Sequence, residues 1–286
     1  MFLSVSAVIP TYNRARCLPR AIKSVIGQSP TVDEIIVVDD CSTDSTREVC
    51  AEFSEAVKYI RHSSNRGASA ARNTGIREAR NEWVAFLDSD DYWLMNKLEK
   101  QMRFMTERGF RVSCTDFTLY HRSGAERGHS LVKDELLDLR HFLWGCFICP
   151  GSTMIVRKAV FEQFGYFDES LRRLEDWDWF LRIARHEQVG NLREVLSVIN
   201  DTGFPHESAV VSSLEIIRRK YMGTSSFSNR EKRCIRAGMA MEAAKMAWIR
   251  QDYLLLALYL IKSLCHAPLG NLAFHTVVAR KLRYGV

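Results

Sequence analysis

The sequence predicts an α/β protein, with a mainly parallel sheet flanked by helices and an α-helical extension at the carboxyl end. Short apolar runs alternate with segments of helical periodicity through the first half of the chain, which indicates repeated βαβ units. Strand patterns stop near residue 214, and only helical patterns follow. The chain has 286 residues, 47% of them hydrophobic, which is enough for one large domain and an appendage. We therefore expect domains at residues 1–213 and 214–286.

Strands and helices alternate in the first part of the chain. Apolar runs predict strands at Val5–Pro10, Glu34–Asp39, Val57–Arg61 and Trp83–Leu87. Apolar residues at helical spacing predict helices from Leu18 onward, from the capping sequence CSTDST through Phe53, and from Ala68 to about Arg80. Because parallel strands need crossover helices, this order favours a parallel sheet covered by helices.

The second part of the chain is less regular. We expect a helix over 96–107, an extended segment over 111–119, a strand over 152–156 and a helix over 177–184. The stretch 120–150 has only one short apolar pattern, so it is a candidate lid together with the loop 200–212. Two further helical patterns cover 236–248 and 253–265.

Net charge is +6, but it is distributed unevenly along the chain. Residues 215–286 carry 13 basic and 4 acidic side chains, whereas residues 1–214 carry 27 basic and 30 acidic ones. A basic helical tail suits an anionic lipid surface or a phosphorylated partner, and a solvated helical face explains it equally well. No nucleic-acid partner is expected, because the first part is slightly acidic and has no zinc-finger, RRM or basic-zipper signature.

No membrane-spanning helix and no signal peptide are expected. The longest strictly apolar run is Leu254–Ile261, which is shorter than the roughly 20 residues that a spanning helix needs. The amino-terminal sequence MFLSVSAVIPTYNR lacks a basic lead, a long apolar stretch and a small-residue cleavage site. The expected location is cytoplasmic, with peripheral attachment to the inner face of the cell membrane left open.

The eight cysteines are scattered through a chain without a secretion signal, so we expect reduced and mostly buried thiols. Cys146 and Cys149 form a CxxC pair, but no second pair stands at zinc-finger spacing. This favours core positions for both over a zinc site.

Polar residues follow each of the first four predicted strands, where ligands of open α/β sheets bind. These segments are Pro10-Thr11-Tyr12-Asn13-Arg14, Asp39-Asp40-Cys41-Ser42, Asn65-Arg66-Gly67 and Asp88-Ser89-Asp90-Asp91. An aromatic ring, a carboxylate and small hydroxyls can stack on and hydrogen-bond a nucleobase such as uracil. Because the carboxyl ends of parallel strands meet at one edge, we expect the four segments to converge on one crevice.

Asp88 and Asp90 stand two positions apart at the end of the fourth predicted strand. Their hard carboxylate oxygens suit Mg²⁺ or Mn²⁺, which take substrate phosphate oxygens as further ligands. The alternative is that an aspartate caps the helix that follows, since a carboxylate at a helix amino terminus is favoured by the helix dipole. One aspartate would be explained in this way, but three within four residues are not.

A second acidic cluster, Glu175-Asp176-Trp177-Asp178, lies in the second half of the chain. Bulky aromatic neighbours desolvate a carboxyl group and raise its pKa toward the range of a useful general base. A helix that begins near Asp176 would lower that pKa instead, so a capping role stays open.

The motifs PTYNR, VVDDCSTD, NRGASAARN, FLDSDD and LEDWDWFLR, in this order and spacing, closely resemble the family 2 glycosyltransferases of the GT-A fold. The resemblance covers roughly residues 3–205. It implies inverting transfer of a sugar from a nucleotide-diphosphate donor to a hydroxyl of a glycan or polyprenyl-linked acceptor in bacterial surface-polysaccharide biosynthesis. It also implies a divalent metal, Mn²⁺ or Mg²⁺.

The resemblance implies roles for individual residues. Thr11, Tyr12 and Asp40 would hold the base and ribose, and Arg72 would lie near the diphosphate. The remaining residues expected at the nucleotide sugar are Pro10, Asn13, Arg14, Gly67, Asp88 and Ser89. Asp88 and Asp90 match the DxD motif, with Asp90 the more direct metal ligand.

The same resemblance matches Asp176 to the catalytic base, with Glu175 beside it in the catalytic pair. Glu175, Trp177 and Asp178 would shape the acceptor site. His206 is a candidate for a histidine that approaches the metal in many members. The family's usual tyrosine-arginine lead is replaced here by Asp201-Thr202-Gly203, so an exposed loop histidine is the alternative.

Several alternatives stay open. UDP is the preferred nucleotide because a small pyrimidine suits a Thr-Tyr-Asp pocket, and dTDP is the other choice. The apolar residues of the basic tail predict peripheral membrane contact, packing on the first domain, or a homodimer. A non-catalytic sugar-nucleotide-binding or scaffold protein is the alternative function. A nucleotidyltransferase or dehydrogenase is disfavoured because PTYNRARC lacks the glycines of a phosphate-binding loop.

Overall fold

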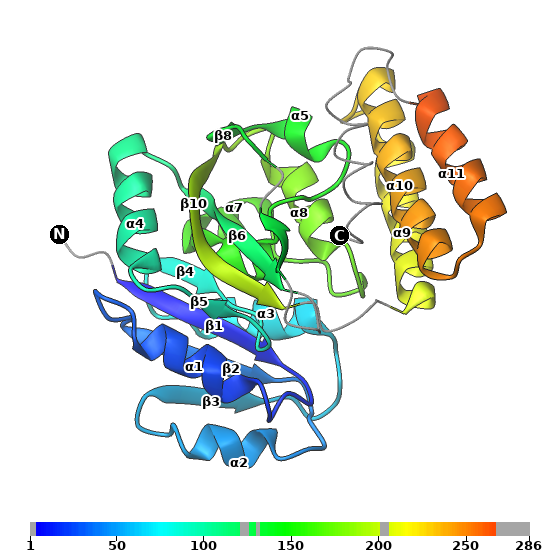
Figure 1. Cartoon of the computed structure of the whole chain (residues 1–286). Helices are drawn as coiled ribbons and strands as arrows, with labels where there is room; N and C mark the ends of the chain where they lie inside the picture. The colour runs from blue at the N-terminus through cyan, green and yellow to red at the C-terminus, as the bar shows by residue number, and fades with distance from the viewer. Residues whose placement is uncertain (1–3, 121–125, 130–131, 201–205, 267–286) are drawn as a thin grey trace. The chain divides into compact units, whose positions relative to one another are not determined.

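The computed structural model describes residues 4–120, 126–129, 132–200 and 206–266, with the backbone alone at 126–129 (Figure 1). The chain forms two compact units. The first comprises the described residues of Met1–Asp138, Phe147–Glu169 and Arg182–Thr202. The second comprises Leu139–Cys146, Ser170–Leu181 and the described residues after 203.

The amino-terminal half of the first unit is the predicted parallel sheet. Its strands are β1 (Val5–Thr11), β2 (Glu34–Asp39), β3 (Val57–Arg61) and β4 (Trp83–Phe86), which pair in parallel in the order β3-β2-β1-β4. The connecting helices are α1 (Leu18–Ile26), α2 (Thr46–Ala51) and α3 (Ala68–Glu78). The bounds of β2 and β3 agree with those predicted. β2 is a continuous buried apolar run after a polar first residue, whereas β3 contains Lys58 and is mostly half-buried.

The sheet continues beyond β4 with a change of direction. The short strand β9 (Ile155–Arg157) runs antiparallel between β4 and β6 (Val112–Tyr120). Next to β6 lies β10 (Val189–Asn200), in parallel, and β5 (Tyr92–Trp93) forms the edge in antiparallel pairing. Two further strands pair off this path, β7 (Glu126–His129) with β6 and β8 (Leu136–Leu137) with β10. The helices of this part are α4 (Lys97–Arg108), α6 (Pro150–Thr153) and α7 (Lys158–Phe164).

The strand predicted over 152–156 is only partly present. Its first residues form the short helix α6, which starts at Pro150, and only Ile155 onward pairs in β9. Proline is favoured at the first turn of a helix because its missing N–H would be unpaired there. The long strand β10 was not predicted, because Arg193 and Glu194 interrupt its apolar pattern where the register with β6 shifts.

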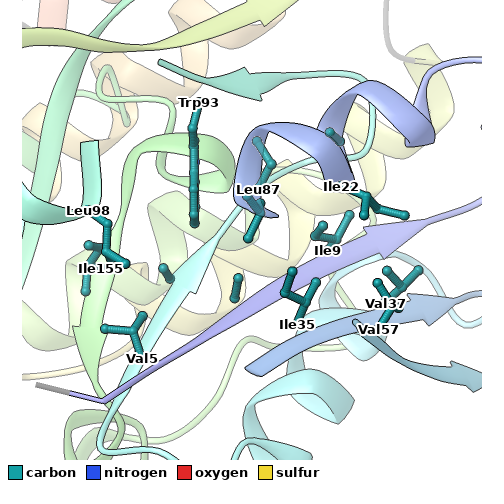
Figure 2. Close-up of a cluster of buried hydrophobic side chains, with 14 of the residues drawn as sticks. Val5, Ile9, Ile22, Ile35, Val37, Val57, Leu87, Trp93, Leu98 and Ile155 are labelled. Carbon is teal, nitrogen blue, oxygen red and sulfur yellow. The ribbon is translucent and has the colours of Figure 1, made fainter. Parts of the chain in front are cut away.

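One face of the sheet is held by a continuous apolar cluster, which Figure 2 shows in close-up. Val5 and Ile9 of β1 pack with Ile22 of α1 and with Leu98 of α4. Every second side chain of β1 points to this face, so the alternation of the strand supplies apolar residues to the core.

On the opposite side, α3 lies directly on β1. A Cβ added at Gly75 would stand 2.3 Å from Val8 Cγ1, so only glycine allows this approach. The close packing places the amino terminus of α3 beside the carboxyl ends of the parallel strands.

The second unit is helical. It contains α5 (Leu139–Phe142), the first turns of α8 (Glu175–Ile183), α9 (Glu207–Met222), α10 (Asn229–Ile249) and α11 (Tyr253–His266). Phe142 and Phe180 stack with ring centroids 4.4 Å apart. Ser228 and Glu231 form a capping box at the start of α10. The domain boundary predicted at residues 213 and 214 falls within α9.

Two other expectations can be compared with the structure. All eight cysteines are free thiols, but only Cys50, Cys114 and Cys234 are buried. The core position expected for Cys146 and Cys149 is wrong, since both are partly exposed. Cys149 precedes α6 in a left-handed turn, and the Cys146 thiol donates to the Asp176 carboxylate. Among the described helices, none is both long and apolar enough to cross a bilayer.

Candidate functional site

The carboxyl ends of the parallel strands meet at one edge of the first unit. Thr11 of β1 pairs with Asp39 of β2, which pairs with Arg61 of β3. On the other side, Val8 of β1 pairs with Phe86 of β4, two residues before Asp88. The structure therefore brings the polar segments after the strands to a common edge, as the sequence predicts.

Asn13 joins the first two of these segments. It has a φ of 53°, and its side-chain oxygen accepts from the backbone N–H of Thr43 at 2.7 Å. Its own N–H donates to Ser42 Oγ at 2.8 Å. The loop after β1 is thus fixed to the loop after β2, and Tyr12 is left 45% exposed beside it. Pro10 is buried within β1, so it shapes the strand end.

Asp40 has both carboxylate oxygens engaged within the protein. The backbone N–H groups of Arg66 and Gly67 donate to it at 2.9 and 2.6 Å, and His62 Nδ1 lies 2.8 Å from Oδ1. Only 3% of the residue is exposed. These contacts fix the loop before α3, where Gly67 has a φ of 95°. The predicted contact of Asp40 with a base or ribose stays a prediction, and shaping this loop is the role that the geometry shows.

Thr11 is a buried hydroxyl without a hydrogen-bond partner among the described residues. It lies at the carboxyl end of β1. A buried polar group that lacks a partner costs free energy, so it commonly marks a place where a ligand or water completes the hydrogen bond.

Asp88 and Arg72 form an ion pair at the end of β4. Arg72 Nη2 donates to Asp88 Oδ1 at 2.6 Å, and the arginine side chain is only 9% exposed. Gly151 of α6 lies against this pair: an added Cβ would stand 2.3 Å from Asp88 Oδ2 and 3.0 Å from Arg72 Nη2. Only a glycine at this position leaves the pair in place.

We expect Gly151→Ala to displace Asp88 and Arg72 and to weaken ligand binding at this edge by up to about a hundredfold, the cost of misplacing a binding group by roughly 1 Å. Thermal unfolding with and without the nucleotide diphosphate expected from the sequence measures this loss of affinity. The matched control is Gly223→Ala, because the nearest atom to a Cβ there is Arg219 O at 4.0 Å. Unchanged nucleotide affinity in Gly151→Ala would show that the pair is not part of the site.

Asp90 lies near two arginines. Arg14 Nη2 is 3.4 Å from Asp90 Oδ2, and Arg20 donates to the Asp90 carbonyl at 2.8 Å. Helix α4 begins only at Lys97 and has Asn96 at its N-cap. The capping alternative for Asp88 and Asp90 is therefore excluded.

The two carboxylates fit a hard divalent cation. Asp88 is about one-third exposed and Asp90 less so, and both belong to the segment that follows β4. Among the described residues no group of three or more potential ligands is preformed. Mg²⁺ and Mn²⁺ are commonly held by one or two carboxylates together with substrate phosphates, so this ligand set suits a cation that binds with its substrate.

Sequence reasoning missed Ser152 and gave Asp91 no role of its own within the segment after β4. The Asp91 side chain accepts from the Ser152 hydroxyl and from the Asn200 N–H, and Ser152 Oγ accepts from the Asp88 N–H at 3.0 Å. Burial, with the charges of Asp88 and Asp90, raises the pKa of Asp91 well above its ordinary value. These contacts join the segment after β4 to α6 and β10. The third aspartate in the run DSDD was the one sequence feature that indicated such contacts.

In the second unit, the first turn of α8 carries the other acidic cluster. Burial, then the neighbouring Glu175 charge, raises the pKa of Asp176 to about 6, although the Trp177 N–H donates to Asp176 Oδ1 at 2.7 Å. Desolvation therefore outweighs the effect of the helix amino terminus. A carboxyl with this pKa is suited to general-base catalysis near neutral pH.

Trp177 and Asp178 are fully buried in the second unit. The Trp177 indole donates to the Phe142 carbonyl at 2.6 Å, and Asp178 accepts from Lys220 and from the Tyr221 hydroxyl. The predicted acceptor contacts of both stay predictions, and the burial of the two side chains argues against such contacts.

Exposed His206 lies at the N-cap of α9, and its metal role also stays a prediction. Ser89 is buried beside Asp88.

An open α/β sheet with polar loops at the carboxyl ends of its parallel strands is the architecture of proteins that bind nucleotides at that edge. The first unit has this architecture. The model of the family described as "Glycosyl transferase family 2" matches residues 6–165, and the chain belongs to this family.

Relatives and solved structures agree with this assignment. An uncharacterised glycosyltransferase of Rickettsia conorii is 35% identical over 70% of this chain and 33% of its own length. The putative teichuronic acid biosynthesis glycosyltransferase TuaG of Bacillus subtilis is 41% identical over 50% of this chain and 59% of its own. The chain thus spans less than two thirds of these relatives. S. aureus TarS residues 1–349 superpose with a TM-score of 0.66 at 19% identity, covering 99% of this chain and 89% of that one. The predicted GT-A fold is confirmed.

Proposed function

We propose that the protein transfers a sugar from a UDP-sugar to a hydroxyl of a glycan or lipid-linked acceptor in cell-surface polysaccharide biosynthesis, with inversion of the anomeric centre. Family membership supports glycosyl transfer. A relative in Escherichia coli, 41% identical over 35% of this chain and 40% of its own length, is named as a glucosyltransferase that uses UDP-Glc and a diphosphoundecaprenol-linked acceptor. TarS has been solved in complex with UDP-GlcNAc. A dTDP-sugar is the alternative donor.

Asp90 and Asp88 are the residues that would hold Mn²⁺ or Mg²⁺. When bound, such an ion supplies positive charge that neutralises the developing charge of a departing nucleotide diphosphate. Arg72 supplies a fixed positive charge beside Asp88, and Arg14 supplies another beside Asp90. The donor's phosphates would therefore meet cations that the protein has already oriented, which lowers the cost of reorganisation during transfer.

Asp176 is the proposed general base. The acceptor hydroxyl oxygen forms a bond to the anomeric carbon as the bond from that carbon to the phosphate oxygen breaks. The hydroxyl proton passes to the Asp176 carboxylate, and the bonding electrons leave with the nucleotide diphosphate. A single in-line displacement inverts the anomeric centre, so no covalent intermediate on the protein is required.

The unpartnered Thr11 hydroxyl is the observation that carries the nucleotide part of the proposal. We expect Thr11→Val to raise the free energy of unfolding of the ligand-free protein by about 1 kcal/mol, because a buried unpaired hydroxyl is removed. The same change should weaken UDP binding about tenfold through loss of one hydrogen bond. Thermal unfolding with and without UDP or dTDP, in the presence of Mn²⁺, measures both effects.

The matched control is Thr115→Val. The Thr115 hydroxyl in β6 is also buried without a partner among the described residues, but it lies within the strand and away from the carboxyl-edge loops. This variant should gain stability and keep the wild-type response to UDP. If UDP stabilises Thr11→Val as strongly as the wild type, Thr11 does not contact the nucleotide. If neither nucleotide stabilises the wild type, the proposed donor class is wrong.

A further inference from the structure

Helix α11 in the second unit has an apolar face that is open to solvent. Leu254 is 88% exposed and Ile261 is 58% exposed. The other large apolar residues exposed on this helix are Tyr253, Leu258 and Leu264. At 100° per residue these five side chains fall on one side of the helix. Such a continuous exposed surface usually marks a place where another molecule binds.

The opposite side of α11 packs on α10. Leu256 and Ser263 are the buried residues of α11, and the Ser263 hydroxyl donates to the Ala237 carbonyl of α10 at 3.0 Å. At the other end, Trp248 and Tyr253 meet edge to face across the turn between the two helices. The helices thus form an antiparallel hairpin, seen side by side in Figure 1. Because α10 covers only the packing face of α11, the apolar face stays exposed among the described residues.

Most carboxylates near these helices are already paired. Glu215 binds Arg218 and Arg219, and Glu207 binds Arg250. Further along, Glu242 binds Lys245, and buried Asp178 binds Lys220. These pairs offset most of the positive charge of α9 and of the carboxyl half of α10.

A second set of cations has no carboxylate partner within the described part of the chain. It consists of Arg230, Lys232, Arg233 and Arg236 in the first half of α10 and Lys262 in the last half of α11. Since the hairpin is antiparallel, these two halves lie at the same end. The positive excess therefore gathers at the end of the hairpin where α10 begins and α11 ends.

The positive charge at this end of the hairpin affects the pKa of His266. Its pKa is lowered by burial and by the positive charges of Arg236 and Arg233. The same two arginines are exposed. An anionic surface that meets this end would be attracted by charge, while the adjoining apolar side chains would enter its hydrophobic boundary.

We infer that the exposed face of α11 and the cations at its carboxyl end dock the protein on an anionic lipid bilayer. The helix has 14 residues, about 21 Å at 1.5 Å per residue, so it lies along the interface and does not cross the membrane. A second copy of the chain would present the same excess of positive charge, so charge complementarity favours the lipid surface. The inference does not depend on the proposed transfer reaction.

Co-sedimentation of the full chain with vesicles tests the inference. We expect at least about tenfold stronger partitioning onto phosphatidylcholine vesicles that contain phosphatidylglycerol than onto phosphatidylcholine alone, with the preference lost at high salt. Ile261→Ser/Leu264→Ser should lower the partition coefficient about tenfold or more, because exposed apolar surface is lost. Arg233→Gln/Arg236→Gln should lower it by a similar factor, because each basic side chain near the surface contributes.

Two matched controls stay within the second unit. Val211→Ser removes an exposed apolar residue of α9, 56% exposed, and should bind vesicles as the wild type does. Arg218→Gln/Arg219→Gln removes the same number of positive charges from α9, where both arginines share the Glu215 carboxylate, and it should also bind normally. Equal binding to both vesicle types, or unchanged binding of the two test variants, would overturn the inference. A different result would also overturn it: the wild type forms a dimer in light scattering and does not bind vesicles, and this dimer dissociates in Ile261→Ser/Leu264→Ser.

Discussion

Replacing Asp176 with asparagine is expected to lower the rate of sugar transfer by about a thousandfold while leaving UDP affinity unchanged. General-base catalysis typically contributes a factor of about 10² to 10⁴, and an amide cannot accept the acceptor's proton. Asparagine keeps an oxygen that can accept from the Trp177 N–H, so the first turn of α8 should stay folded. Single-turnover transfer assays and titration calorimetry with UDP measure the two quantities separately.

The same substitution should also change the pH dependence of the free energy of unfolding, which can be measured without an acceptor. The pKa of Asp176 is about 6 in the folded protein against an ordinary value of 3.8. A carboxyl with a raised pKa contributes stability that is present below about pH 4 and lost as the pH rises through 6. Asp176→Asn should therefore increase the free energy of unfolding at pH 7.5 by up to about 3 kcal/mol and change it little at pH 4.

Glu175→Gln is the companion variant. After burial, the Glu175 charge is the next cause of the raised pKa of Asp176. Wild-type turnover should rise with pH through about 6 as Asp176 loses its proton, and Glu175→Gln should shift this rise to lower pH. Wild-type turnover in Asp176→Asn would remove Asp176 from the role of base. If Asp176 only caps α8, Glu175→Gln should have the same pH profile of turnover as the wild type.

Asp90→Asn is expected to abolish the stabilisation that Mn²⁺ adds to UDP binding and to lower turnover by about a thousandfold. Charge neutralisation by a bound metal is worth several kcal/mol in the transition state, and an amide oxygen is a weaker ligand for a hard cation. Thermal unfolding with UDP, with Mn²⁺ and with both together measures the metal-dependent part without any acceptor.

The control for Asp90→Asn is Glu78→Gln. Glu78 is an exposed carboxylate of α3 that pairs with Lys58 at 2.7 Å. This variant should retain the full combined response to UDP and Mn²⁺. If Asp90→Asn also retains that response, the acidic segment after β4 is not the metal site and the proposed role of Asp88 and Asp90 fails with it.

The parallel half of the fold could be predicted because its strands are short, mostly apolar segments bounded by polar residues. The rest could not be predicted with the same success. Tyr92 and Trp93 form a two-residue edge strand that is too short to show a period. In β10, the charged pair at Arg193 and Glu194 coincides with the shift in register against β6. Such strands depend on tertiary pairing, which local patterns do not encode.

For the candidate site, the sequence predicted which loops would meet but not how their side chains are used. Asp40 reads as a ligand-binding carboxylate, yet its partners at His62, Arg66 and Gly67 appear only once the chain is folded. Gly151 carries no chemical signature, and its importance comes from the approach of α6 to Asp88. Asp176 was identified, but the balance between burial and the helix dipole needed the structure.

The contacts of Asn13 and Asp40 affect how a donor would be captured. Both loops are fastened by hydrogen bonds that form when the chain folds, so their conformational entropy is lost before any ligand arrives. A nucleotide that binds to these loops would meet a preorganised backbone, so binding would not have to order the loops. Association should accordingly be fast and carry only a small entropic penalty, as in recognition by rigid antibodies rather than by segments that fold on contact.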